Sequence, residues 1–427
     1  MTNRNPRYPL NAGRLTPDGM RLLHQGQPVQ LRGINLVDKG HKTADGWQFI
    51  PCWPQQLWQR FAQGGMNVVR LGVIWAAIEP VPGAYDKKYL DFIEQQLDLA
   101  AQAGIAVILD MHQDLYAQRY ADGAPDWAVL TDTPFTPTAL WSDAYLTSQA
   151  VQQCWDAFWS DQPAPQTGIG LQQNFAATWR MLAQRFGGHP ALLGYDILNE
   201  PAPGSEIQEM FALLMHHALA DLSGKEKDAL GIVSDDVADM AAVFADPVRK
   251  LRWLDILNDS ARYEKIGRSS QEPVMRFERD TLGPFYSRVA AAIRQEDSTT
   301  FLLRGHNYIS NIGVPPGLAA ITIDGQQDAR QIFAPHGYDL VVDTPDVPRA
   351  SNSRAHSIFA RHRETQQAIN LPVIVTEWGG FDASPVAFTH GQYLIDLFEG
   401  WGWGHTYWCY TDEFFDAPMA RVLAQLS

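Results

Sequence analysis

Eight short apolar segments, separated by segments with helical periodicity, constrain the fold of this 427-residue chain more than any other feature. Each apolar run is nearly continuous, which is typical of parallel strands that are covered on both faces. The predicted strands are residues 29–36, 66–75, 105–112, 192–200, 300–306, 330–338, 371–380 and 404–410. The predicted helices are residues 54–65, 86–104, 171–188, 281–295, 351–369 and 384–399.

Strands that alternate with helices predict a parallel sheet, and eight such units predict a closed (β/α)₈ barrel of the α/β class, the TIM-barrel architecture. No glycine-rich dinucleotide motif follows the first strand, which argues against an open doubly wound sheet. A hairpin with Gly26 near its turn is expected just before the first barrel strand.

Two connections are far longer than the roughly two to six residues of an ordinary strand–helix loop. They cover about 113–170, after strand three, and about 202–280, after strand four. Both leave the C-terminal ends of strands, where the functional sites of barrels are built, so we expect them to act as lids. Residues 1–427 are expected to form one barrel domain without a separate C-terminal β-sandwich, because the segment after residue 410 suffices for only one helix.

The charge and the chain ends narrow the range of partners. A net charge of −15 repels phosphate groups, which argues against nucleic acid or an anionic membrane as the main partner. No apolar run approaches the ~18 residues of a membrane span, so no stable membrane insertion is expected. The opening residues, MTNRNPRYPL, lack the apolar core of a signal peptide, so we expect a chain that is cytoplasmic or secreted with its leader removed. The oligomeric state stays open.

Two glutamates come at the ends of predicted strands. Glu200 ends the run LLGYDILNEP, and Glu377 ends the run LPVIVTEW. In a parallel barrel both strand ends face one mouth, so the two carboxyl groups are expected to lie close together. A neutral carboxyl beside an ionised one is the arrangement that glycoside hydrolysis requires, and their separation decides between retention and inversion. The alternative is two unrelated ionic residues near strand ends.

Six motifs in a fixed order carry a resemblance that spans residues 28–410. They are VVRLG, DMHQD, DILNEP, APHGY, IVTEWG and YWCY. Together they resemble glycoside hydrolase family 5 of clan A. The resemblance implies a (β/α)₈ barrel and a retaining double displacement, with Glu200 as acid/base and Glu377 as nucleophile. It implies no cofactor and no metal, and further substrate-binding residues at Arg70, His112, Asn199, His336, Tyr338 and Trp408.

The chemistry of these side chains suits the implied roles. Arg70 can hold Glu377 ionised through a charge-assisted contact. Asn199 can donate to a sugar 2-hydroxyl, a contact that strengthens in the transition state. Trp408 offers a flat face to the sugar ring, and Tyr338 can hydrogen-bond the nucleophile. A metal bound by the His112-x-Asp114 pair is not expected, because no third ligand cluster is spaced for it.

Finer features resemble one branch of the family. RGINLVDKG at 32–40 and DMHQDLY at 110–116 are similar to the endoglycoceramidase and related glycosylceramidase group, which implies a glycolipid substrate. The likeness places Lys39 and Asp114 on sugar hydroxyls, with Trp155 and Gln173 as additional candidates for the sugar wall. The 202–280 insertion is the expected source of a trough for lipid chains.

Two other functions stay open. An endo-β-glucanase or β-mannanase would need a long groove with tryptophan platforms, which the tryptophan-rich 127–159 segment permits. An inactive carbohydrate-binding barrel is a further alternative, against which the two glutamates argue.

Overall fold

The computed structural model describes residues 15–44, 46–234, 237–381 and 383–423. The opening residues, on which the leader expectation rests, and the last four residues of the expected terminal helix lie outside this range. No helix in the described part of the chain is long and apolar enough to span a membrane.

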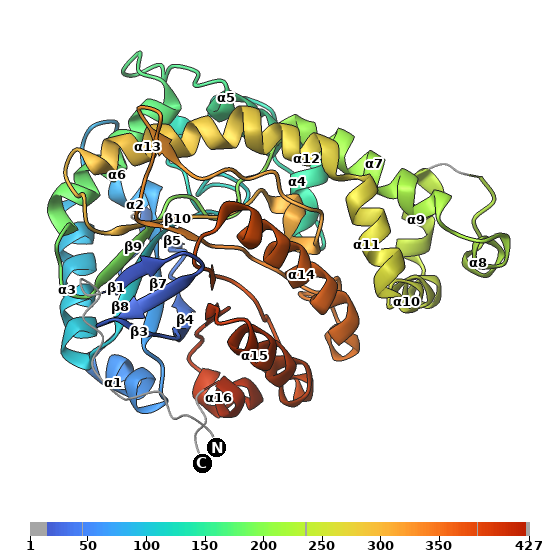
Figure 1. The fold of residues 1–427 in the computed structure, drawn as a ribbon. Helices are drawn as coiled ribbons and strands as arrows, with labels where there is room; N and C mark the ends of the chain where they lie inside the picture. The colour runs from blue at the N-terminus through green and yellow to red at the C-terminus, as the bar shows by residue number, and fades with distance from the viewer. Residues whose placement is uncertain (1–14, 45, 235–236, 382, 424–427) are drawn as a thin grey trace.

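The described residues form a (β/α)₈ barrel (Figure 1). Eight parallel strands neighbour one another in the order β13-β10-β9-β8-β7-β4-β15-β14, and the bridge Phe333–Val373 joins the two outer strands. Their bounds are β4 Arg32–Leu36, β7 Val68–Ile74, β8 Ala106–His112, β9 Leu192–Asp196, β10 Phe301–Arg304, β13 Gln331–Phe333, β14 Ile374–Val375 and β15 Gly404–Tyr407. All eight predicted barrel strands are therefore confirmed.

Alternate residues of the strands belong to different parts of the core. Val68 and Ile108 pack together in a smaller cluster. Their neighbours Val69 and Val107 pack in the main cluster with the surrounding helices. The N-terminal hairpin supplies Leu15 and other apolar side chains to the smaller cluster, so the hairpin covers one end of the barrel. It consists of β1 Leu15–Asp18, β2 Arg21–His24 and β3 Gln27–Pro28, with a turn through Gly26 as predicted.

The predicted helices form with small shifts at their ends. They are α1 Gln55–Gln63, α3 Lys87–Ala103, α6 Leu171–Phe186, α13 Gly283–Arg294, α14 Asn352–Ile369 and α15 His390–Gly400. Helix α3 begins where Asp86 caps the Tyr89 amide and ends at Gly104, whose left-handed backbone suits glycine. The segment predicted as one helix at 384–399 is divided, because a 3₁₀ turn, Pro385–Phe388, precedes α15.

The second long insertion folds mainly as helices, whereas the first is mostly irregular and contains two short ones. The first contains α4 Ala144–Thr147 and α5 Gln149–Trp159. The second contains α7 Ile207–Ala220, α8 Gly224–Leu230, α9 Val237–Ala245, α10 Pro247–Ile256, α11 Ser260–Ser269 and α12 Gln271–Phe277. In Figure 1, helices α8 to α11 extend from the side of the barrel. A π-helical turn, Glu278–Leu282, then joins α12 to α13.

The strands are shorter than the sequence predicts, and two of them end before a glutamate. Strand β9 ends at Asp196 and β14 at Val375, so Glu200 and Glu377 lie beyond the regular ladder. The backbone nevertheless stays bonded to the neighbouring segments. The Asn199 backbone amide donates to Met111 O at 3.0 Å, and Glu377 forms an isolated β-bridge with His336. The apolar runs continue past the ladder because these residues are buried without being paired as strands.

Candidate active site

A buried arginine gathers the carboxylates at the mouth of the barrel. Arg70, on β7, is fully buried. Its guanidinium nitrogens lie 2.8 Å from Asp196 Oδ2, 2.8 Å from Asp110 Oδ1 and 2.5 Å from Glu377 Oε1. The guanidinium also donates to Asn199 Oδ1 at 2.9 Å. Arg70 thus joins β8, β9 and the segment after β14 through ion pairs, and its contacts with Asp196 and Glu377 are also charge-assisted hydrogen bonds.

The backbone at Glu200 is held in an uncommon conformation. Its φ of 41° lies in the left-handed region, which costs energy for any residue with a side chain. The Gln113 amide group donates to the carbonyl of Asn199 at 2.8 Å and to that of Glu200 at 3.1 Å. In return the Asn199 amide group donates to Gln113 O at 3.0 Å. These bonds hold the backbone bend at Asn199 and Glu200, the corner at Glu200, and so fix the direction of the Glu200 side chain.

The two glutamate side chains share His336 and otherwise have different partners. Glu200 Oε1 accepts from Asn311 Nδ2 at 2.6 Å and lies 2.9 Å from His336 Nδ1. Glu377 Oε2 accepts from the Tyr338 hydroxyl at 2.9 Å and lies 3.5 Å from the same histidine nitrogen. Oxygens of the two carboxyl groups lie within 4.8 Å of each other.

Burial sets the protonation of this group. It raises the pKa of Glu200 to about 8, with the Asp114 charge adding to the effect. It raises the pKa of Glu377 to about 7, although the Arg70 guanidinium opposes the rise. Burial lowers the pKa of His336 to about 3, so its ring is neutral near pH 7. The Arg70 contact with Glu377 expected from the sequence is present, but burial outweighs its effect on the pKa.

A second group of side chains lies beside the glutamates. Trp408 stacks on His112 with ring centroids 5.1 Å apart and planes 13° apart. His112 Nδ1 bonds Asp110 Oδ2 at 2.7 Å, which turns Nε2 toward Asp114, 3.9 Å away. The Lys39 ammonium bonds Asp114 and lies 5.2 Å from the centroid of the Trp408 ring. The structure thus brings Lys39, His112, Asp114 and Trp408 together, as the sequence predicts.

The acidic cluster around His112 already contains a cation. His112, Asp114 and Asp122 are close enough to share a metal ion. However, the Lys39 ammonium bonds Asp114 and lies 3.4 Å from Asp122 Oδ2. Because this ammonium supplies the positive charge between the two carboxylates, the cluster is better described as an ion-pair network than as a metal site.

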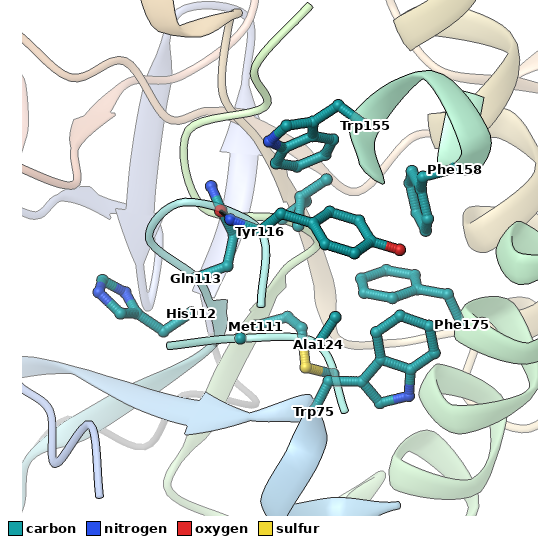
Figure 2. A pocket seen from close by; sticks show the side chains of 11 residues that line it. Trp75, Met111, His112, Gln113, Tyr116, Ala124, Trp155, Phe158 and Phe175 are labelled. Carbon is teal, nitrogen blue, oxygen red and sulfur yellow. Dashed lines mark hydrogen bonds between the residues drawn. The ribbon is translucent and has the colours of Figure 1, made fainter. Parts of the chain in front are cut away.

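Two predicted site residues are not brought to the glutamates. Trp155, on α5, is only 2% exposed and packs against Tyr116 and Trp159, with ring centroids 5.2 Å and 5.3 Å away. Figure 2 shows it among the aromatic side chains that line a pocket together with His112 and Gln113. Gln173 is exposed on α6, where its amide group donates to Asp161 at 3.4 Å. The structure therefore does not support a sugar wall at Trp155, because its ring is buried among other aromatic side chains.

Several site residues were missed by sequence reasoning. Asp110 and Asp196 lie inside two of the quoted motifs, so their buried strand positions were a usable signal. Gln113 lies in the same motif as Asp110. Asn311 had no signal, since it follows no strand run and belongs to no motif. Trp141 is 38% exposed, and its ring centroid lies 5.9 Å from Lys39 Nζ. In the sequence it is one of several tryptophans of the first insertion, and nothing sets it apart from the others.

The barrel and its paired carboxyl groups define the architecture of a glycoside hydrolase. A model of the family described as cellulase (glycosyl hydrolase family 5) matches residues 22–414 of this chain. The chain belongs to glycosyl hydrolase family 5.

Two relatives place the chain near one branch of the family. It is 29% identical over 199 residues to endoglycoceramidase I of Rhodococcus hoagii (strain 103S), a match that covers 46% of this chain and 39% of the relative. It is 31% identical over 164 residues to an endoglycoceramidase of Cyanea nozakii, covering 33% of this chain and 31% of the relative. The chain therefore matches less than half the length of each of these relatives.

A solved structure agrees over a larger part of the chain. Endo-glycoceramidase II from Rhodococcus sp., solved as a five-membered iminocyclitol complex, superposes with a TM-score of 0.68 at 25% identity. That match covers 96% of this chain and 80% of the other. It agrees with the barrel fold described above.

Removing the Arg70 charge should destabilise the protein as well as stop any activity. Arg70→Met leaves three carboxylates without their buried cation, and breaking such a buried pair typically costs about 3–5 kcal/mol. Thermal unfolding of the variant should begin at a clearly lower temperature. Arg185→Met is the matched control, since Arg185 pairs with the half-exposed Asp91 and Glu94 and should cost about 1 kcal/mol or less. Equal losses would contradict the central role of Arg70.

Proposed function

We propose that the protein is a retaining β-glycosidase that cleaves the β-glycosidic bond of glycolipids of the glycosylceramide type. One observation carries the proposal: oxygens of Glu200 and Glu377 lie within 4.8 Å of each other in two different environments. Carboxyl groups about 5–5.5 Å apart favour a covalent glycosyl-enzyme, whereas inversion needs about 6.5–9.5 Å to admit a water.

The proposed reaction has two displacements. Glu377 attacks the anomeric carbon while Glu200 gives its proton to the departing glycosidic oxygen, so a glycosyl ester of Glu377 forms and the alcohol leaves. Glu200, now ionised, then takes a proton from water. The water oxygen attacks the anomeric carbon, and the bond from that carbon to Glu377 breaks. The sugar leaves with its original configuration, and both carboxyl groups are restored.

The neighbouring residues have supporting roles in this proposal. Arg70 and Tyr338 donate to opposite oxygens of Glu377 and so orient it for attack. Asn199, held by Arg70, faces the sugar 2-hydroxyl. Lys39 and Asp114 form directed hydrogen bonds to other hydroxyls above the Trp408 ring.

Support for a lipid aglycone comes from the relatives and from one surface. The relatives bear the name endoglycoceramidase, and the second insertion carries exposed apolar side chains, namely Val233, Phe244 and Val248. Other apolar residues of this insertion are buried, among them Leu214, Val243, Trp253 and Leu254. In this proposal both insertions act as lids of one catalytic barrel domain, and the second contacts the lipid.

Chemical rescue tests the roles of the two glutamates. Glu377→Ala and Glu200→Ala should each lose nearly all activity. Azide should restore turnover in the Glu377 variant by attacking directly, and the glycosyl azide should have inverted configuration. In the Glu200 variant azide should instead attack the glycosyl-enzyme and give a retained product. Proton NMR of the two glycosyl azides gives the configuration of each anomeric carbon. A retained azide from the Glu377 variant and an inverted one from the Glu200 variant would show that the acid/base and nucleophile roles are reversed.

The pH profile follows from the two raised pKa values. Glu377 must be ionised, so activity should fall as pH drops below about 7. Glu200 must be protonated, so activity should fall as pH rises above about 8. With a dinitrophenyl glycoside, which needs no proton to leave, Glu200→Gln should keep the acidic limb of kcat/KM and lose the alkaline one. An alkaline limb that persists would exclude Glu200 as the acid.

A pair of substrates, one with a lipid aglycone and one without, tests whether the second insertion contacts the lipid. Phe244→Ser should raise KM for a ceramide glycoside and leave a short aryl glycoside unchanged, because about 25 cal/mol is lost for each Å² of apolar contact removed. Phe388→Ser is the control, since Phe388 has a similar exposure, 48% against 43%, outside both insertions. Lys39→Ala and Asp114→Ala should impair both substrates.

A panel of glycosylceramides, cellooligosaccharide and mannan separates the remaining functions. Release of sugar from the polysaccharides without a preference for lipid would favour a β-glucanase or β-mannanase. No release from any member, nor from an aryl β-glucoside, would favour an inactive carbohydrate-binding barrel.

A further inference from the structure

A short turn after β10 is attached to the corner that carries Glu200. The turn is a 3₁₀ helix, Tyr308–Ile312. Its first amide, from Tyr308, donates to Pro201 O at 3.0 Å. Near its end, Asn311 Nδ2 donates to Glu200 Oε1 at 2.6 Å. The turn therefore bonds both the backbone after Glu200 and the Glu200 side chain.

The two oxygens of Glu200 have different surroundings. Oε1 receives the Asn311 amide group and lies 2.9 Å from His336 Nδ1. Because the His336 ring is neutral, its contact with an acceptor oxygen requires the proton on Nδ1. No group among the described residues forms a hydrogen bond with Oε2. An oxygen that already accepts two hydrogen bonds cannot also hold the carboxyl proton favourably, which leaves Oε2 for it.

We propose that Asn311 is a positioning residue for the acid/base: with His336 it occupies Glu200 Oε1, and so keeps the transferable proton on Oε2. The inference rests on the proposed role of Glu200. None of the six sequence motifs includes Asn311. It differs from His336 because, among the described residues, the only hydrogen bond of its side chain is to Glu200.

Asn311 is itself held from two sides. Glu278, buried in the π-helical turn, accepts from the backbone and side-chain amides of Asn307 at 2.8 Å and 2.7 Å. The Asn307 side chain in turn caps the 3₁₀ turn at Ile309. On the other side, Asn311 O accepts from the Tyr338 amide at 3.1 Å. These bonds use the backbone or other side chains, so they survive a change of the Asn311 side chain.

The hydrogen bond from Asn311 to Glu200 should stabilise the site most when Glu200 is ionised. A donor bonded to a carboxylate favours the charged form, so the Asn311 bond opposes the rise of the Glu200 pKa caused by burial. In the first displacement Glu200 becomes negative as the alcohol leaves. A donor already aimed at Oε1 stabilises that charge without rearrangement.

The test compares pH profiles of kcat/KM. Asn311→Leu, of similar size but without a donor, should move the alkaline limb upward by about one pH unit. Its kcat on an alkyl or ceramide glycoside should fall about tenfold, while a dinitrophenyl glycoside should be nearly unaffected. Ser310→Ala is the matched control, since Ser310 lies in the same turn, is also buried and, in the described part of the chain, forms no hydrogen bond with Glu200.

The outcomes separate this inference from the proposed function. An alkaline limb that stays in place in Asn311→Leu, with equal losses on both substrates, would overturn it. Asn311→Asp keeps the shape of the side chain and replaces the donor by an acidic group, so it should also move the alkaline limb upward. This variant tests the inference if Asn311→Leu does not fold. If Glu200→Gln keeps the alkaline limb, the proposed role of Glu200 fails instead.

Discussion

The buried guanidinium of Arg70 is the interaction on which the rest of the site depends. Three carboxylates from three parts of the barrel, Asp110, Asp196 and Glu377, lie within 2.8 Å of its nitrogens. Without that cation, bringing these groups out of water and together would cost several kcal/mol for each charge. With it, the C-terminal ends of the strands are fixed in one arrangement, and Asn199 is oriented as well.

From this centre the two glutamates acquire different properties. Glu377 is bonded by Arg70 and by the Tyr338 hydroxyl, which suits an ionised group that attacks carbon. Glu200 lies farther from the cation, beside neutral donors from Asn311 and His336, which suits a group that holds and releases a proton. The difference between an acid and a nucleophile is thus made by neighbours, since both side chains are glutamates.

Both insertions are attached to this centre by hydrogen bonds. The first contributes Gln113, whose amide group holds the strained corner at Glu200. The second ends in the π-helical turn, where Glu278 anchors the Asn311 turn. Both insertions therefore reach the corner at Glu200 through buried hydrogen bonds, while helices α8 to α11 of the second lie at the side of the barrel (Figure 1).

The sequence by itself determined the eight-strand barrel, the hairpin before it and the two glutamates, because apolar periodicity and position at a strand end are local properties. It also indicated Arg70, Lys39, His112, Asp114 and Trp408, which the fold brings together. Tertiary structure alone decided the rest. Trp155 looked like a sugar platform, but only packing shows which face of α5 is buried. Asn311 carries no local signal, since its significance comes from a contact with Glu200 across 111 positions of the chain.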